Sequence, residues 1–426
     1  MMKAHPPAAE ATEAQADLAA RVAALARLDL VAPTKAGIGP LFSALQPLIR
    51  RLGISPPPGA APLVATHAQL RLLERPELGS EELLDLPEPV LARLRAGEGF
   101  VAFDTSTEGR PFSLRHVQAM HGALERAGLP PSRAGWLQQN RDIAPYYRSY
   151  CAEQGIAPMR VLTADAFGFG LWRRLAGAQP RPVCWPFGFA LAPGPRRYRW
   201  ICLNYMLRPH RALLATWLME RPEPGHLSFS TRRPVTDVSA RPILLNAVRR
   251  LSRGDEAAVA RVAALLEEGL HLGGDTDGFA NAFERVYSLP EQEVAAAELF
   301  IVTETEMASP GLGRWTEKTL KALATGLPII VFGNLGTVAA LAALGFDMLD
   351  DLVDHGYDAV AAPEDRFAAA RVSVARFLAR PPGFTEAEMR RLRAASAHNR
   401  EVFAREILRV AALDPLDAVL AAVDGG

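Results

Sequence analysis

The stretch from Leu299 to Gly336 contains the residues best suited to chemistry in this chain. Within it, Thr316 is followed directly by Glu317 and Lys318 at the start of a segment with helical spacing. A helix N-terminus presents unpaired backbone N–H groups and the positive end of the helix dipole, which attract anions such as phosphate. Lys318 would add a full charge beside them, and Glu317 could accept hydrogen bonds from ribose hydroxyls. The pattern therefore suits a phosphorylated ligand.

The same residues also have a purely structural interpretation. Glu317 could simply complement the helix dipole, and Lys318 could be a solvated surface residue. Capping arrangements of this kind are common, so the spacing alone leaves both interpretations open.

The segments around these residues predict a parallel α/β unit. The apolar runs 299–302 and 329–332 indicate buried strands, and residues 316–326 between them indicate a helix. Thr316 suits the N-cap of this helix and Gly326 its left-handed C-terminal position. Because functional loops follow the carboxyl ends of parallel strands, the chemistry is expected at that edge.

Arg208, His210 and Arg211 surround a second predicted helix N-terminus. Cations are disfavoured at this end of a helix, so the arrangement is easier to understand if an anion lies among them. A diphosphate would fit, because the guanidinium of arginine forms a bidentate fork to phosphate oxygens. Pairing with Glu220 or another structural acid is the alternative.

The donor-side residues resemble the nucleotide-sugar-binding segment of GT-B glycosyltransferases, and of the α-1,3-fucosyltransferase family in particular. The resemblance rests on Thr316-Glu317-Lys318, Ala322-Leu323, Gly326, Pro328-Ile329-Ile330 and Gly333. It implies that Glu317 contacts the ribose and Lys318 the diphosphate of a nucleotide sugar. The residues Gly345-Phe346 and His355-x-Tyr357-Asp358 are similar to sequences in bacterial and phage relatives of the same donor domain.

A second feature of the fucosyltransferases is an Asn on a strand with an Arg a few residues beyond it. Asn204, followed by Arg208 or Arg211, resembles that arrangement. The resemblance also implies inversion at the anomeric carbon. Positive side chains and a helix terminus would stabilise the departing diphosphate without a metal ion.

An inverting transfer needs a carboxylate that takes the proton of the acceptor hydroxyl. Glu108, just past the carboxyl end of the predicted strand 99–103, is the candidate for this base. Asp104 and Asp165 are weaker candidates, and a surface Glu beside a glycine turn is the alternative for Glu108. The Asp275-x-Asp277 spacing, flanked by glycines, indicates a plain turn, so no metal site and no cofactor are predicted.

The length of 426 residues predicts two or three domains, and the alternation of strand and helix patterns predicts an α/β protein with two Rossmann-like domains. The resemblance implies that these form a GT-B architecture. We expect a helical N-terminal region over 1–96, an acceptor-side domain over 97–190, a donor domain over 191–365 and C-terminal helices over 366–426 that pack back. Residues 63–73 are expected to continue the helical pattern of the first region.

Composition limits the partners. The formal net charge is zero, which gives no electrostatic argument for a nucleic-acid or membrane partner. No apolar run approaches the roughly 20 residues of a membrane helix, and the N-terminus shows no signal peptide. The three cysteines lack metal-ligand spacing and indicate reduced thiols in a cytoplasmic protein.

The leading hypothesis is a glycosyltransferase that takes a nucleotide sugar and an acceptor that is a glycan, a lipid-linked molecule or a protein. The alternative is a catalytically inactive nucleotide-binding or scaffold protein whose N-terminal helical region forms the interaction surface. A Rossmann-type dehydrogenase is disfavoured, because no predicted strand is followed by the G-x-G-x-x-G spacing.

Overall fold

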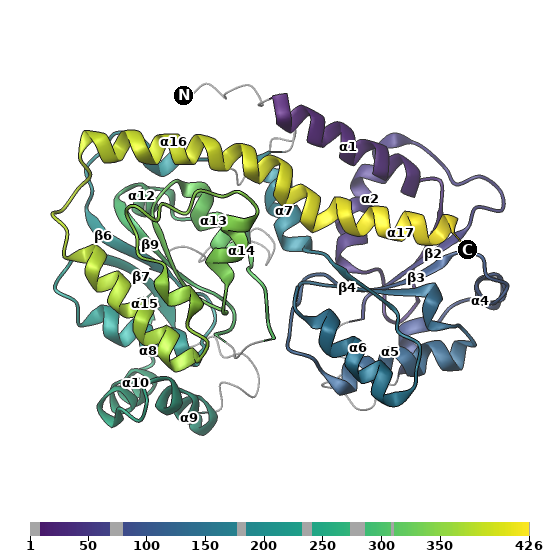
Figure 1. Cartoon of the computed structure of the whole chain (residues 1–426), viewed down its shortest axis with the longest axis horizontal. Helices are drawn as coiled ribbons and strands as arrows, with labels where there is room; N and C mark the ends of the chain where they lie inside the picture. The colour runs from purple at the N-terminus through teal and green to yellow at the C-terminus, as the bar shows by residue number, and fades with distance from the viewer. Residues whose placement is uncertain are drawn as a thin grey trace. The chain divides into compact units, whose positions relative to one another are not determined.

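The computed structural model describes residues 9–68, 80–176, 185–231, 241–272, 286–307 and 311–425. The chain forms two compact units. Unit 1 comprises Met1–Ala178 with Ala404–Gly426, and unit 2 comprises Gln179–Phe403. Each unit contains a five-stranded, mainly parallel sheet flanked by helices (Figure 1). The predicted α/β fold with two Rossmann-like sheets is thereby confirmed.

The sheet of unit 1 has its strands in sequence order, β1-β2-β3-β4-β5, and every neighbouring pair is parallel. The strands are β1 (Asp29–Val31), β2 (Pro62–Thr66), β3 (Phe100–Thr105), β4 (Ala134–Gln138) and β5 (Arg160–Thr163). All residues of β2, β3 and β4 are buried. Strands covered on both faces require continuous apolar runs, which explains the short hydrophobic segments of this half of the chain.

Helices cover both faces of this sheet (Figure 1). The helices of unit 1 are α1 (Ala9–Leu25), α2 (Pro40–Leu52), α4 (Glu88–Arg95), α5 (Leu114–Ala127), α6 (Ile143–Gln154), α7 (Ala166–Leu175) and α17 (Asp414–Asp424), with a 3-10 turn η1 (Ser80–Leu84). On one face, Val117 and Met120 of α5 pack against Phe103 and Trp136 in the main core cluster. On the other face α17 contacts β3 and β5, and α1 lies along α2 and α17.

The N-terminal region differs from its prediction. Residues expected to be helical include β1 and β2, which form one side of the sheet of unit 1. All five residues of β2 are buried. This stretch therefore has no polar positions whose spacing could distinguish a strand from a helix. The remainder of that predicted segment, residues 69–73, lies outside the described residues.

The sheet of unit 2 has the order β10-β9-β6-β7-β8 and is parallel except for the β7–β8 pair. Its strands are β6 (Tyr198–Leu203), β7 (Gly225–Ser230), β8 (His271–Leu272), β9 (Ala297–Thr303) and β10 (Ile329–Phe332). The chain passes from β6 outward to β7 and β8, and then returns to place β9 on the other side of β6. The strand order therefore reverses between β6 and β9.

The helices of unit 2 also lie on both faces of its sheet (Figure 1). They are α8 (Pro209–Met219), α9 (Arg241–Leu251), α10 (Glu256–Glu268), α12 (Glu291–Ala295), α13 (Glu317–Thr325), α14 (Thr337–Ala343), α15 (Pro363–Leu378) and α16 (Glu386–Val402). Helix α13 contacts β9, β10 and α16, whereas α8 contacts β7, α9 and α10. The two helices that follow β6 and β9 thus begin at the same edge of the sheet.

The predicted ends of α13 are confirmed. The Thr316 hydroxyl accepts a hydrogen bond from Lys318 N, and Gly326 ends the helix with a φ of 85°. A larger residue at Gly326 would also crowd Leu191, because its Cβ would lie 2.9 Å from the side chain of that leucine. In the next helix, α14, Gly336 occupies the N-cap position at a φ of 72°, and Thr337 is the first helical residue.

Candidate functional site

The candidate donor residues lie at the point where the strand order of unit 2 reverses. In open parallel sheets, ligands bind outside the carboxyl ends of the strands at such a switch point. Asn204 follows β6 and Glu304 follows β9, the two strands on either side of it. The N-termini of α8 and α13 come next along the chain. The sheet topology therefore brings together two groups of residues that the sequence presents about 100 positions apart.

Glu304 organises the N-terminus of α13. Its carboxylate accepts hydrogen bonds from Thr316 N at 2.9 Å, Thr316 Oγ1 at 2.5 Å and Thr319 Oγ1 at 2.5 Å. The side chain is buried. These bonds fix the residue that caps α13 and, with it, the start of the helix. Glu304 was missed as a site residue in the sequence; its position directly after a predicted strand was the available signal.

Glu317 and Lys318 form an ion pair at the first turn of α13. Lys318 Nζ lies 2.7 Å from Glu317 Oε1 and 3.4 Å from the hydroxyls of Thr305 and Thr316. Burial by itself would raise the pKa of Glu317, but the charges of Lys318 and Lys321 and the hydrogen bond from Lys318 outweigh it and hold this pKa below its ordinary value. Glu317 is therefore ionised at neutral pH, and the Lys318 side chain is partly exposed.

Arg211 is buried and bonded within the protein. Its guanidinium donates to Met206 O at 3.0 Å, Thr303 O at 3.2 Å and Glu304 O at 2.9 Å. Burial and the charge of Arg208 lower its pKa to about 10, so it stays positive at neutral pH. Arg211 is thus a buried positive charge next to the switch point, and its hydrogen bonds hold the carboxyl end of β9 in place.

His210 also contacts the end of β9. Burial, and next the charge of Arg211, lower its pKa to about 3, so its ring is neutral. A neutral ring can bond a carbonyl only through its N–H, and Nε2 therefore donates to Glu304 O at 3.0 Å. His210 consequently acts as a fixed donor to the backbone.

Arg208 occupies the N-cap position of α8 and is half-buried. The helix has no side-chain hydrogen bond at this cap, and its first residue, Pro209, has no N–H. The charge of Arg208 lowers the pKa of both His210 and Arg211, which shows how closely these positive groups lie. Of the two predicted arginines, Arg211 is the one enclosed by carbonyl oxygens, and Arg208 is the more accessible.

Asn204 ties the two central strands together. Thr303 Oγ1 donates to Asn204 Oδ1 at 2.5 Å, and Asn204 N donates to Ser228 O at 3.0 Å. The side chain is buried, so it fixes the ends of β6, β7 and β9. Gly333 lies close by: a Cβ there would be 3.1 Å from Cγ of Glu304, which leaves little room for a larger residue. Tyr357 accepts from Val331 N and packs in the core.

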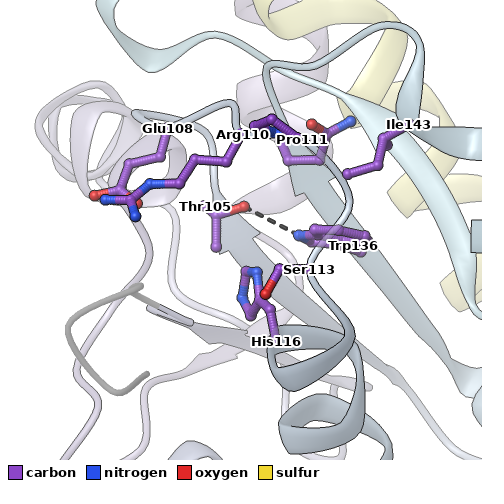
Figure 2. Close-up of a pocket in the computed structure, with 9 residues that line it drawn as sticks. Thr105, Glu108, Arg110, Pro111, Ser113, His116, Trp136 and Ile143 are labelled. Carbon is purple, nitrogen blue, oxygen red and sulfur yellow. Dashed lines mark hydrogen bonds between the residues drawn. The ribbon is translucent and has the colours of Figure 1, made fainter. Parts of the chain in front are cut away.

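The predicted base, Glu108, lies in unit 1 beside a small pocket at the carboxyl ends of β3 and β4 (Figure 2). The cavity has a volume of about 10 Å³, room for roughly one water molecule. Its lining combines Thr105, Glu108, Arg110, Pro111, Ser113, His116, Trp136, Gln138 and Ile143. Trp136 Nε1 donates to Thr105 Oγ1 at 3.1 Å. Glu108 is half-buried, and sequence analysis did not single out the other polar lining residues.

His116 in this pocket has a neutral imidazole ring at neutral pH. Burial lowers its pKa to about 4, although the hydrogen bond to Ala68 O opposes the shift. As a neutral ring it donates from Nε2 to Ala68 O at 3.2 Å, so its Nδ1 carries a lone pair.

The two weaker carboxylate candidates are helix caps. Asp104 Oδ2 accepts from Leu41 N at 2.8 Å at the start of α2, and Asp104 Oδ1 accepts from Ser106 N at 2.9 Å. Asp165 Oδ1 accepts from Gly168 N at 2.9 Å and from Gln139 Nε2 at 2.7 Å. Both side chains are buried, so Glu108 is the more accessible carboxylate of the three.

Comparison of the chain with models of protein families, curated proteins and solved structures gives no match. Within the described ranges, no cluster of three or more His, Cys, Asp or Glu side chains could hold a metal ion. The Asp275-x-Asp277 turn lies outside those ranges, as does Cys184, whereas Cys151 and Cys202 are buried thiols. No described helix is long and apolar enough to cross a membrane.

Proposed function

We propose that this protein is a glycosyltransferase of GT-B type that binds a nucleotide-diphosphate sugar in unit 2 and transfers the sugar to an acceptor hydroxyl. The observation that carries the proposal is the switch point between β6 and β9. The two helix N-termini, Lys318 and Arg208 gather there, on the side of the sheet where nucleotides bind in folds of this kind.

The proposed donor contacts follow from accessibility. Lys318 is a partly exposed cation in the first turn of α13, so it would bind the diphosphate, while ionised Glu317 would accept from the ribose hydroxyls. Arg208 would provide the second cation. Arg211 and Asn204, included in the resemblance, would act indirectly, because their polar groups are bonded to the strand ends.

In the proposed reaction, the acceptor oxygen attacks the anomeric carbon and forms the new glycosidic bond. The bond from that carbon to the diphosphate oxygen breaks, and its electron pair leaves with the nucleoside diphosphate. The positive groups at the helix N-termini would stabilise this departing charge. The acceptor hydroxyl would lose its proton to a base of unit 1, for which Glu108 is the candidate.

The test is thermal unfolding of the purified chain with GDP, UDP, CMP, ADP and dTDP. A ligand that binds the native state stabilises it by about 2.7 kcal/mol at a concentration of 100 times Kd. We expect one nucleotide to raise the melting temperature of the wild type and to lose most of this effect with Lys318→Ala. Lys35→Ala, an exposed lysine of unit 1, is the matched control and should retain it.

Hydrolysis of the corresponding nucleotide sugar then separates an enzyme from a binding protein. Slow release of free sugar, abolished by Lys318→Ala, would support a transferase. Nucleotide binding with no turnover in the presence of sugar, glycan and lipid acceptors would favour the scaffold alternative. Absence of stabilisation by every nucleotide at millimolar concentration, with and without Mg²⁺, would end the proposal.

A further inference from the structure

Glu304 contacts both helices that begin at the switch point. Through its carboxylate it bonds the first turn of α13, and through its backbone carbonyl it bonds the first turn of α8. Most of the residues that the sequence marks as donor ligands lie at these two helix starts, and the other two, Asn204 and Gly333, directly follow β6 and β10.

On the α13 side, three donors converge on one carboxylate. They are Thr316 N, Thr316 Oγ1 and Thr319 Oγ1, at 2.9, 2.5 and 2.5 Å. Two oxygens with several lone pairs are needed to accept all three bonds. A glutamine at this position would replace one oxygen by an NH₂ group. In place of Oε1 this group would face Thr316 N, and in place of Oε2 it would face Thr305 N, which donates to Oε2 at 3.3 Å, so one backbone N–H would lose its acceptor in either orientation.

On the α8 side, the Glu304 carbonyl accepts from His210 Nε2 at 3.0 Å and from Arg211 Nη2 at 2.9 Å. Its N–H donates to Phe332 O at 3.0 Å, which fixes it to β10. The carbons of its side chain occupy the space that a Cβ at Gly333 would need. The residue is therefore held in one position by β10, α8 and α13.

We propose that Glu304 is the positioning residue of the donor site: it sets the spacing between the α8 and α13 N-termini to suit a diphosphate. This inference rests on the proposed function. Glu304 does not touch the ligand, because its carboxylate is buried and occupied by the two threonines. It acts through Thr316, whose place in the chain fixes Glu317 and Lys318.

The test measures nucleotide affinity of the full chain by calorimetry, with the nucleoside diphosphate found in the thermal screen and with inorganic pyrophosphate. Glu304→Gln should weaken both ligands by roughly tenfold to a hundredfold, the size of effect expected when supporting residues release ligand-binding groups. Asp347→Asn is the matched control: it removes another carboxylate of unit 2 that bonds an arginine, Arg391, and a backbone N–H, that of Leu349. This control should change Kd by less than about twofold, because residues that do not contact a site affect it little.

A second pair of variants leaves the Glu304 carboxylate in place and changes one of its partners. Thr319→Val removes one of the three bonds to Glu304 and should weaken binding, whereas Thr319→Ser keeps the hydroxyl and should restore the affinity. A purely structural role predicts lower melting temperatures with unchanged Kd for both Glu304→Gln and Thr319→Val, and that result would overturn the inference. If the wild type binds neither ligand, the proposed function itself fails, and this inference falls with it.

Discussion

Asp104 provides a test of which electrostatic effect dominates at a buried helix cap. Its carboxylate accepts N–H bonds from Leu41, Phe42 and Ser106, which favour the charged form. Complete burial opposes them and is the larger effect, so the pKa rises from 3.8 to about 6. This shift corresponds to about 3 kcal/mol of folding free energy.

The sign follows from proton binding. Between pH 3.8 and about 6 the folded state holds a proton on Asp104 that the unfolded state has released. Stability from this group is therefore fully present below pH 3.8 and is lost as the pH rises through about 6. Asp104→Asn is isosteric and does not titrate, so it removes this dependence.

The assay is urea unfolding of wild type and Asp104→Asn from pH 4 to 7.5, followed by circular dichroism and tryptophan fluorescence. The free energy of unfolding of the wild type minus that of the variant should fall by about 2.4 kcal/mol across this range, which begins just above the unfolded pKa of 3.8. A difference that stays flat, or that rises with pH, would show that the helix N-terminus and the three N–H bonds outweigh burial, and would refute the reasoning.

Three further predictions concern stability. Gly39→Ala should destabilise unit 1 by at least roughly 1–3 kcal/mol, because the new methyl group would lie 2.2 Å from Cβ of Asp104. Urea titration measures this loss, and a change of less than about 0.5 kcal/mol would contradict the prediction. Thr316→Ala should cost about 1–2 kcal/mol through loss of the α13 cap, with Thr316→Ser as the control that keeps it. Glu298→Gln should cost about 3–5 kcal/mol, because the buried Arg199 keeps its carbonyl partners but loses the opposite charge at 2.7 Å; an unchanged melting temperature would argue against that.

The local structure of the donor half was predictable from the sequence. A threonine before a helical run and a glycine after it marked both ends of α13, and the structure confirms Thr316 and Gly326 there. The strands β9 and β10 were found as short β-branched runs, because strands buried on both faces have no polar alternation. Such signals come from residues that are close in sequence, so they can be recognised without knowledge of the fold.

Other parts could not be predicted for the same reason. β1 has three residues, and β2 lies in an apolar run that suits helix or strand equally. The pairing of β2 with β3, and of β1 with β2, decided their structure. Arg208 and Arg211 look alike in the sequence as possible phosphate ligands. Only the carbonyl oxygens at the end of β9, about 90 positions further along, distinguish the enclosed Arg211 from Arg208.

The sequence by itself determined where the elements begin and end and which residue types stand at the carboxyl ends of the strands, because capping, glycine conformation and burial patterns are local. The tertiary structure decided which of these ends meet. Thr303 and Asn204 are 99 positions apart and share a hydrogen bond only because β9 pairs with β6. Strand order also decided which charges are buried, since desolvation and Coulomb interactions depend on neighbours in space and not in sequence. For that reason the position of Glu304 after a strand was readable in the sequence, whereas its hydrogen bonds to the first turns of α8 and α13 were visible only in the folded chain.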